Sequence, residues 1–288
     1  MNVKPECLSC LIDRAIYMCD LVIDDESRKF EALEELLDYA AKNFSKESVP
    51  ALIGTQREEI IKKYSGRDDP YEELKRKSNE VAKELLPIAE DFYKNSPDKL
   101  EALIRIMSTA NSMEYGVRGH TFDHDSFGQV FEETLREQLV GDMEKIRSLI
   151  DEQEKILYIL DNCGEVIFDI FAIERFIEMG KEVVTAPKTG PIINDATVKD
   201  LEDAEFKHKV VPSGAYIGTN PEMSTKEFLE LFWNPEYLIL AKGMGNYETI
   251  SEFEDELKGR IIYILRAKCN SVASNLKVNK GELVARLV

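Results

Sequence analysis

The residues best suited to chemistry follow a short apolar run at positions 156–160. Asp161 and Asn162 come directly after that run, and Gly164 precedes the start of a helical pattern. Five apolar residues without polar alternation predict a buried strand of a parallel sheet. Ligands of open α/β sheets bind beyond the carboxyl ends of the strands, where these two side chains would offer oxygen atoms to a divalent cation. They could instead cap the following helix, and the run alone leaves both interpretations open.

Similar loops follow the other predicted strands. We expect strands at residues 156–160, 182–186, 209–212, 237–241 and 261–266, with a last one at 283–288. The loops after the first five are rich in Gly, Asn, Asp, Ser or Lys, and they cover residues 161–165, 187–195, 213–214, 242–246 and 268–271. If the strands are parallel, these loops share one edge of the sheet. One such loop is ordinary turn chemistry, whereas five at one edge predict a binding site.

Two kinds of element must position this edge. Residues 5–108 show helical periodicity almost throughout and predict a helical bundle. A polar break follows at residues 111–125, and from residue 155 onward apolar runs alternate with helical stretches. This alternation predicts an α/β fold with a doubly wound parallel sheet. We therefore expect a helical region and cleft loop over residues 1–125 and an α/β domain over residues 126–288.

Composition and charge limit the classes of function. The chain has 288 residues, 43% of them hydrophobic, and a formal net charge of −18, which argues against nucleic-acid binding and against anionic membrane surfaces. No apolar run approaches the roughly 18 residues of a membrane span, and the first residues lack the apolar core of a signal peptide, so we expect a cytoplasmic protein. The sequence carries no signal for oligomeric state. A site for an anionic substrate would need a metal or a local cluster of Lys and Arg to overcome the negative electrostatic potential of the whole protein.

Several common sites are absent from the sequence. The turn after the first strand holds only Gly164, whereas a dinucleotide site needs three spaced glycines. Neither a Walker-type phosphate loop nor a Gly-x-Ser-x-Gly nucleophile elbow occurs. A haloacid-dehalogenase-type phosphatase would carry a second Asp where Cys163 stands. None of these absences excludes a metal-dependent site for phosphoryl transfer.

In such a site, Asp161, Asn162 and Asp195 would hold the cation with two carboxylates and one carboxamide. This set balances a divalent ion without giving the site a net negative charge, so the ion can still accept a phosphate oxygen. Lys242, which is followed by glycines at positions 243 and 245, could meet the phosphate with its ammonium group, or it could be a solvated loop lysine.

The sequence Leu-Asp-Asn-Cys-Gly-Glu-Val-Ile-Phe-Asp at residues 160–169 resembles the DUF89 family of metal-dependent damage-control phosphatases. Asn194-Asp195, Ser213-Gly214 and residues 242–248 agree with that family, and the resemblance covers essentially the whole chain. Pro-Glu-Cys-Leu-Ser-Cys at residues 5–10 resembles its cysteine-bearing subgroup in archaea and bacteria. The resemblance implies a helical N-terminal region packed on a Rossmann-like domain of three α/β/α layers.

The resemblance also implies roles for individual residues. Those expected to bind the metal and to be catalytic are Asp161, Asn162 and Asp195, with Lys242 on the substrate phosphate. Those expected beside the substrate are Asn111, Glu114, Ser213 and Gly214, and the supporting carboxylates are Glu165 and Asp169. The family usually has Asp where this chain has Glu114. The cofactor is expected to be Mn, Ni, Co or Mg, since oxygen and amide ligands accept each of them.

A second set of ligand-type residues comprises Cys7, Cys10, His120 and His124. Cys-x2-Cys with His-x3-His is a set that zinc would accept, provided that the fold brings the two pairs together. A structural or redox-active cysteine pair is the alternative.

We expect an enzyme that hydrolyses phosphate monoesters of small metabolites, such as sugar phosphates or damaged phosphometabolites, with a bound metal ion. The first alternative is an S-adenosylmethionine-dependent carboxyl methyltransferase, which would need a glycine-rich first turn and an acidic ribose ligand after the second strand. The second is a non-catalytic protein that binds a metal or a phosphate-bearing ligand at the same edge.

Overall fold

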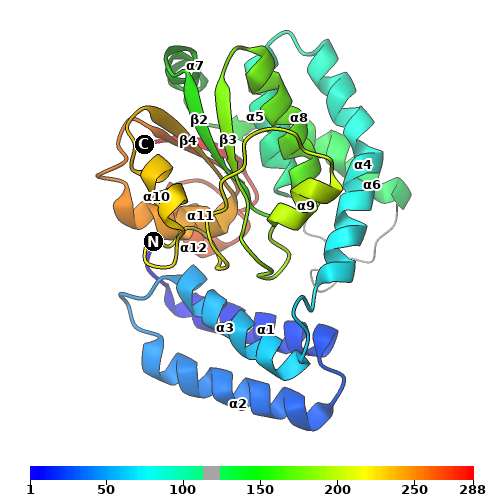
Figure 1. Ribbon diagram of the computed structural model, residues 1–288, viewed down its shortest axis with the longest axis vertical. Helices are drawn as coiled ribbons and strands as arrows, with labels where there is room; N and C mark the ends of the chain where they lie inside the picture. The colour runs from blue at the N-terminus through cyan, green and yellow to red at the C-terminus, as the bar shows by residue number, and fades with distance from the viewer. Residues whose placement is uncertain (113–123) are drawn as a thin grey trace.

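A six-stranded sheet forms the centre of the computed structural model, which describes residues 1–112 and 124–288, with the side chains of residues 124–127 also outside the description (Figure 1). The strand order is β1–β6–β5–β4–β2–β3. The strands are β1 (Leu139–Val140), β2 (Lys155–Ile159), β3 (Glu182–Ala186), β4 (Tyr237–Lys242), β5 (Ile261–Arg266) and β6 (Leu283–Leu287). All neighbouring strands run parallel except β5 and β6. The carboxyl ends of β2, β3, β4 and β5 therefore share one edge.

Side-chain alternation along the strands builds two apolar layers. In β2, Ile156 and Tyr158 belong to one core cluster, whereas Leu157 and Ile159 belong to the other. The first cluster is covered by α4 (Glu72–Asn95), α5 (Lys99–Ala110), α6 (His124–Leu135), α7 (Met143–Glu152), α8 (Glu165–Glu178) and α9 (Val198–Asp203). The second is covered by α10 (Lys226–Phe232), α11 (Gly243–Ile250), the short 3-10 helix Ser251–Phe253 and α12 (Asn270–Leu276). The predicted three-layer α/β/α fold is confirmed.

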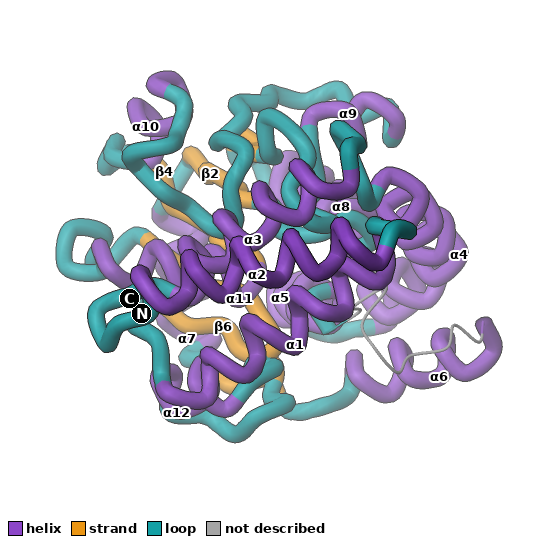
Figure 2. Tube along the Cα trace, turned by 90° about the horizontal axis from the view of Figure 1, so that it is seen from below, coloured by secondary structure: helices purple, strands orange, loops and turns teal. Residues whose placement is uncertain are grey.

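The first three helices form a separate unit below the sheet edge (Figures 1 and 2). They are α1 (Pro5–Val22), α2 (Glu26–Asn43) and α3 (Pro50–Ser65), and their apolar cluster also takes in Ile192 and Ile193 from the loop after β3. The helices expected within residues 1–125 thus contribute to two cores, because α4 and α5 pack on α8 and the sheet. Only α1–α3 make up the unit beside the edge.

Local sequence signals account for the ends of these helices. Proline opens both α1 and α3, where a missing backbone N–H removes no helical hydrogen bond. The carboxylate of Asp25 accepts a hydrogen bond from the backbone N–H of Arg28 at 2.9 Å and caps α2. Gly66 ends α3 in the left-handed conformation, with φ of 69°.

Two features of the sheet differ from the sequence prediction. Residues 209–212 form no strand and pair with β3 only through Thr185 and Val210. Pro187, which follows β3, has no N–H to donate to the carbonyl of Val211, so the regular ladder does not continue. The two-residue strand β1 was not predicted, since it is too short to show a period. Among the described residues, no helix combines the length and apolar character needed to cross a membrane.

Candidate active site

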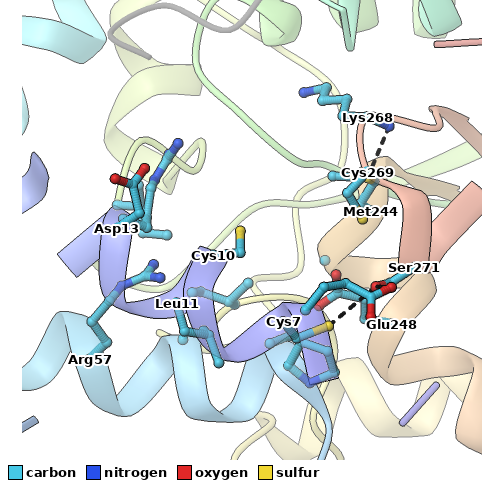
Figure 3. Close-up of a pocket in the computed structure, with 18 of the residues that line it drawn as sticks. Cys7, Cys10, Leu11, Asp13, Arg57, Met244, Glu248, Lys268, Cys269 and Ser271 are labelled. Atoms are coloured by element: carbon cyan, nitrogen blue, oxygen red, sulfur yellow. Dashed lines mark hydrogen bonds between the residues drawn. The ribbon is translucent and has the colours of Figure 1, made fainter. Parts of the chain in front are cut away.

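A cavity of about 680 Å³ lies between the carboxyl edge of the sheet and the helices α1 and α3 (Figure 3). The sheet edge contributes Asp161 and Asn162 after β2, and Asp195 from the loop after β3. The loops after β4 and β5 contribute further lining residues, including Gly245 and Lys268. Four of the five loops that the sequence placed at one edge therefore meet at one cavity.

Backbone hydrogen bonds join the first two of these loops. The N–H of Cys163 donates to the carbonyl of Asn194 at 2.7 Å, and the N–H of Ala196 donates to the carbonyl of Asp161 at 2.8 Å. Asn162 and Asp195 form a bridge pair between the loops. The fold thus brings Asp161, Asn162 and Asp195 together, although 32 residues separate Cys163 from Asp195 in the sequence.

Asp161 is held by two carboxamides. Its Oδ2 accepts hydrogen bonds from Nδ2 of Asn111 at 3.0 Å and from Nδ2 of Asn162 at 2.8 Å. Burial raises the pKa of the Asp161 carboxyl well above its usual range, and the neighbouring carboxylates Glu165 and Asp195 raise it further. The two hydrogen bonds and the nearby lysines Lys268 and Lys242 therefore compensate the charged form of Asp161 only in part.

The backbone of Gly243 passes directly over this carboxylate. A Cβ atom at position 243 would lie 1.7 Å from Oδ2 of Asp161, and the φ of 76° is one that favours glycine. The glycine after β4 thus makes room for the carboxylate after β2. Each loop fixes the other's geometry.

Asp195 lies against Lys188, whose Nζ is 3.8 Å from Oδ2 of Asp195 and donates to the carbonyl of Gly218 at 2.5 Å. Burial raises the pKa of Asp195 to about 7; Lys188 opposes this shift and Glu165 adds to it. Within the described residues, the buried Oδ2 of Asp195 has no hydrogen-bond partner. Buried oxygen atoms in native proteins almost always have a partner, so this one is suited to an external ligand.

These observations test whether the residues fit a divalent cation. A positive ion would stabilise the charged forms of the two buried carboxylates, whose pKa values are raised. It would also give the Oδ2 of Asp195 a partner. Nδ2 of Asn162 donates to Asp161 and to Glu165, which leaves its carboxamide oxygen for a ligand. In the described ranges no three His, Cys, Asp or Glu side chains gather to hold a metal; this set has two such residues and an Asn. The donor set fits a hard cation.

Lys242 lies behind this edge and does not line the cavity. Its Nζ donates to Oε2 of Glu165 at 3.0 Å and to Oδ1 of Asp169 at 2.7 Å, and Tyr158 donates its hydroxyl to the same Asp169 oxygen at 2.6 Å. Although burial alone would lower it, the pKa of Lys242 is raised by Asp169 and Glu165. The structure therefore places the predicted phosphate contact in a buried ion triad, as a counter-charge to the two supporting carboxylates.

The other predicted residues divide between the site and its surroundings. Asn111, at the end of α5, contacts both Asp161 and Glu165. Ser213 is buried and donates to the carbonyl of Pro187 at 3.3 Å, and neither it nor Gly214 lines the cavity. Glu114 lies outside the described residues.

The predicted cysteine pair does line the cavity. Cys7 and Cys10 are free thiols on α1, and Cys269 is a third free thiol that lines the cavity from the loop after β5 (Figure 3). Sγ of Cys7 donates to Oγ of Ser271 at 3.4 Å. The histidine half of the predicted zinc set cannot be placed, because His120 and the side chain of His124 lie outside the described residues.

The sequence did not single out the cations that line the cavity. They are Arg14 from α1, Arg57 from α3, Lys268 after β5, and Lys280. Lys268 falls within a loop that the strand-end argument had selected, so its position was available from the sequence. Arg14 and Arg57 lie on helices with no motif, and only the packing of α1 and α3 against the sheet edge brings them here.

Comparison with known proteins identifies the family of this chain. The family model described as the damage-control phosphatase ARMT1-like domain matches residues 3–284. A damage-control phosphatase of Pyrococcus horikoshii is 35% identical over 289 residues, covering 99% of this chain and 97% of the relative. A damage-control phosphatase of Archaeoglobus fulgidus is 31% identical over 297 residues, covering 100% of both chains.

A solved structure extends the agreement to the fold. The crystal structure of a DUF89 family protein from Pyrococcus horikoshii has a TM-score of 0.87 and 33% sequence identity, and the match covers 99% of this chain and 98% of that one. The predicted resemblance to the DUF89 family is confirmed. The chain belongs to the damage-control phosphatase ARMT1-like family, and its activity class is that of a phosphatase.

Proposed function

We propose that this protein hydrolyses phosphate monoesters of small metabolites with the help of a divalent metal ion. The observation that carries the proposal is the meeting of Asp161, Asn162 and Asp195 at one end of the cavity, with the buried Oδ2 of Asp195 lacking a hydrogen-bond partner within the described residues. Two carboxylates and a carboxamide leave the ion able to accept a phosphate oxygen. Mn, Ni, Co and Mg all suit such ligands.

When bound, the metal would supply Lewis-acid activation and charge neutralisation to the phosphoryl group. The chain's own residues would do the rest. Asn111 and Gly243 fix the position of the Asp161 carboxylate. Lys242 neutralises Glu165 and Asp169 behind the site, so these carboxylates repel an incoming phosphate less than they would alone. Positioning and charge compensation are the main requirements of phosphoryl transfer.

Asp195 is placed to orient the attacking water as well as to hold the cation. Its side chain is buried at the cavity edge, and Nζ of Lys188, 3.8 Å from Oδ2, stabilises the anionic form of the carboxylate. A carboxylate has two acceptor oxygens, so Asp195 could hold the cation with Oδ2 and accept a hydrogen bond from water with Oδ1.

Phosphate release from sugar phosphates and p-nitrophenyl phosphate tests the proposal. Protein stripped of metal would be resupplied separately with Mn, Ni, Co or Mg. We expect release only with metal, and a loss of at least ~100-fold in Asp161→Asn, which keeps the shape of the side chain but removes a charged ligand.

Asp203→Asn is the matched control, because Asp203 has a side chain that is 62% exposed and pairs with Lys199 at the surface. It should keep full activity. Release that persists without any metal, or unchanged release by Asp161→Asn, would contradict the proposal. Metal binding with no release from any substrate would favour a non-catalytic binding protein. A methyltransferase site gains no support from the geometry, since the turn after β2 presents a carboxylate to the cavity.

A further inference from the structure

Arg57 is a buried cation on the wall of the cavity. Only 5% of the residue is exposed, yet it lines the cavity from α3 (Figure 3). Its Nε donates to Oε1 of Glu58 at 2.7 Å, and the other oxygen of Glu58 accepts the hydroxyl of Tyr71 at 2.7 Å. Glu58 is thus fixed from both sides and orients the guanidinium. Among residues 1–112 and 124–288, the two terminal amino groups of Arg57 have no hydrogen-bond partner.

Arg14 contributes a second guanidinium to the same wall. It lies on α1, is half-buried and lines the cavity. Within the described residues it makes neither a hydrogen bond nor an ion pair to a side chain. α1 and α3 pack against each other, so two arginines with free donors reach one cavity from adjacent helices. Glu58 pairs with Nε of Arg57, whereas the terminal amino groups of Arg57 and the whole guanidinium of Arg14 have no acidic partner among the described residues.

Glu58 pairs with Arg57, whereas the acidic residues that line the cavity near the two arginines form no described ion pair with them. They are Glu6, Asp13 and Glu248. Described ion pairs join none of them to Arg14 or Arg57, and Oε1 of Glu6 instead accepts the hydroxyl of Ser271 at 3.0 Å. Burial raises the pKa of Glu248 to about 7, so this carboxyl is partly protonated near neutrality and competes weakly for Arg57. The guanidinium groups are therefore available to an anion from solution.

We propose that Arg14 and Arg57 form a second anion subsite, which binds an acidic group at the end of the substrate remote from the reacting phosphate. This inference rests on the proposed function, which places the reacting phosphate beside Asp161 and Asp195. Planar guanidinium groups bind carboxylates and phosphates with two parallel hydrogen bonds, so the remote group is a carboxylate or a second phosphate. The substrate class is a small phosphorylated acid or bisphosphate.

The size and charge of the cavity agree with such a ligand. Its volume of about 680 Å³ is within the range of small-molecule sites. The sheet edge would hold one anionic end of the ligand through the metal. The helical wall, which is the side of the cavity formed by α1 and α3, would hold the other end through Arg14 and Arg57. A sugar monophosphate without a second acidic group would leave Arg14 and the terminal amino groups of Arg57 without a partner, and a site with unpaired polar groups discriminates against the ligand that lacks their partner.

Equilibrium binding of two phosphonates tests the subsite without requiring turnover. 3-Phosphonopropionate and propylphosphonate are not hydrolysed, and they differ by a carboxylate in place of a methyl group. With Mn²⁺ present, calorimetry on the full-length wild type should show ~10–100-fold tighter binding of 3-phosphonopropionate, as expected for charge-assisted hydrogen bonds. Ethane-1,2-diphosphonate replaces the carboxylate with a second phosphonate, and a preference for either diacid identifies the remote group.

Arg14→Gln and Arg57→Lys should reduce that preference to a few-fold while leaving propylphosphonate binding unchanged. Arg14→Gln removes a charge that the described protein does not pair, so it should fold normally, and Arg57→Lys keeps the charge beside Glu58. Lys226→Gln removes one charge from a side chain that is 92% exposed, and should retain the full preference. Equal wild-type affinity for all three phosphonates, or a preference that both arginine variants retain, would overturn the proposal.

The two proposals fail separately. Absence of phosphate release together with a retained diacid preference would refute the phosphatase proposal and leave the subsite standing. Metal-dependent release from substrates, together with no preference for a second acid, would refute the subsite alone.

Discussion

The sheet edge and the helical wall face the same cavity but offer it opposite chemistry. The edge presents oxygen atoms, from Asp161, Asn162 and Asp195. The wall presents nitrogen donors, from Arg14 and Arg57. The edge is therefore suited to a cation and the wall to an anion. This difference suggests that the reacting group and the remainder of the substrate are handled by different parts of the chain.

The two regions also differ in how their side chains are held. At the edge, a fully buried network of Lys242, Glu165, Asp169 and Tyr158 stands behind the ligand-type residues. Among the described residues, the wall contacts the sheet domain through separate hydrogen bonds without a buried ion network, including the hydrogen bond from the backbone N–H of Ile217 to Oγ1 of Thr55 at 3.0 Å and that from Ser271 to Glu6 at 3.0 Å. Substitutions should therefore have larger effects at the edge than at the wall.

The largest effect is expected for Lys242→Met. The substitution leaves the buried carboxylates Glu165 and Asp169 without their cation, so the free energy of unfolding should fall by about 3–5 kcal/mol. Denaturant unfolding measures the change. Lys226→Met is the control, because its side chain is 92% exposed and its change should stay within about 0.5 kcal/mol. Equal effects of the two substitutions would remove the distinction between a buried and a solvated lysine.

Gly243→Ala should reduce kcat/KM by roughly 100-fold, because its Cβ would displace the Asp161 carboxylate, and misplacement by about 1 Å has an effect of that size. Gly259→Ala is the matched control. Its φ of 81° is also positive, but nothing lies within 4 Å of the added Cβ, so it introduces backbone strain without a collision. Similar losses in both variants would show that strain, and not the position of Asp161, limits the activity.

Glu248, on α11 where the wall meets the sheet domain, should make stability depend on pH. Burial raises its pKa from 4.5 to about 7 in the folded protein. The unfolded chain then releases this proton first, so the folded state loses stability as pH rises from about 4.5 through about 7. Relative to wild type, Glu248→Gln should gain about 1–3 kcal/mol in unfolding free energy between about pH 5 and about pH 8. A constant difference between the two proteins across this range would contradict the shift.

The smallest effect is expected for Thr55→Val. This change removes the hydroxyl that accepts from Ile217 and should lower the unfolding free energy by about 1 kcal/mol more than Thr134→Val. Both threonines are buried on helices and donate to the carbonyl four residues earlier, but only Thr55 also joins the wall to the sheet domain. Denaturant unfolding of both variants gives the comparison, and equal losses would show that the Ile217 contact adds no stability.

The sequence predicted the sheet edge because its signals are local. A buried strand followed by a polar turn identifies Asp161 and Asn162, and parallel strands bring Asp195 to the same edge. The direction of the Lys242 side chain was also available in principle. Residues alternate along β4, so Lys242 shares the face of Leu238 and Leu240, which is the face covered by α8.

The wall could not be predicted in the same way. Helical periodicity shows that α1 and α3 have apolar faces, but it does not specify what those faces pack against. Arg14 and Arg57 acquire a role only because Ile192 and Ile193, in the loop after β3, join the core of α1–α3. That contact links residues far apart in the sequence, and no local pattern reports it.

The wall has one further property: α1 through α3 form an uninterrupted stretch at residues 5–65, whereas the edge is assembled from loops after separate strands. The stretch can therefore change, or be exchanged between relatives, without altering Asp161, Asn162 or Asp195 of the sheet edge. Under the two proposals, the residues that determine the reaction and the residues that determine the substrate lie in different segments of the chain, so they can evolve separately. A family built in this way could acquire new substrates by recombination within its first 65 residues, while its hydrolytic edge stays constant.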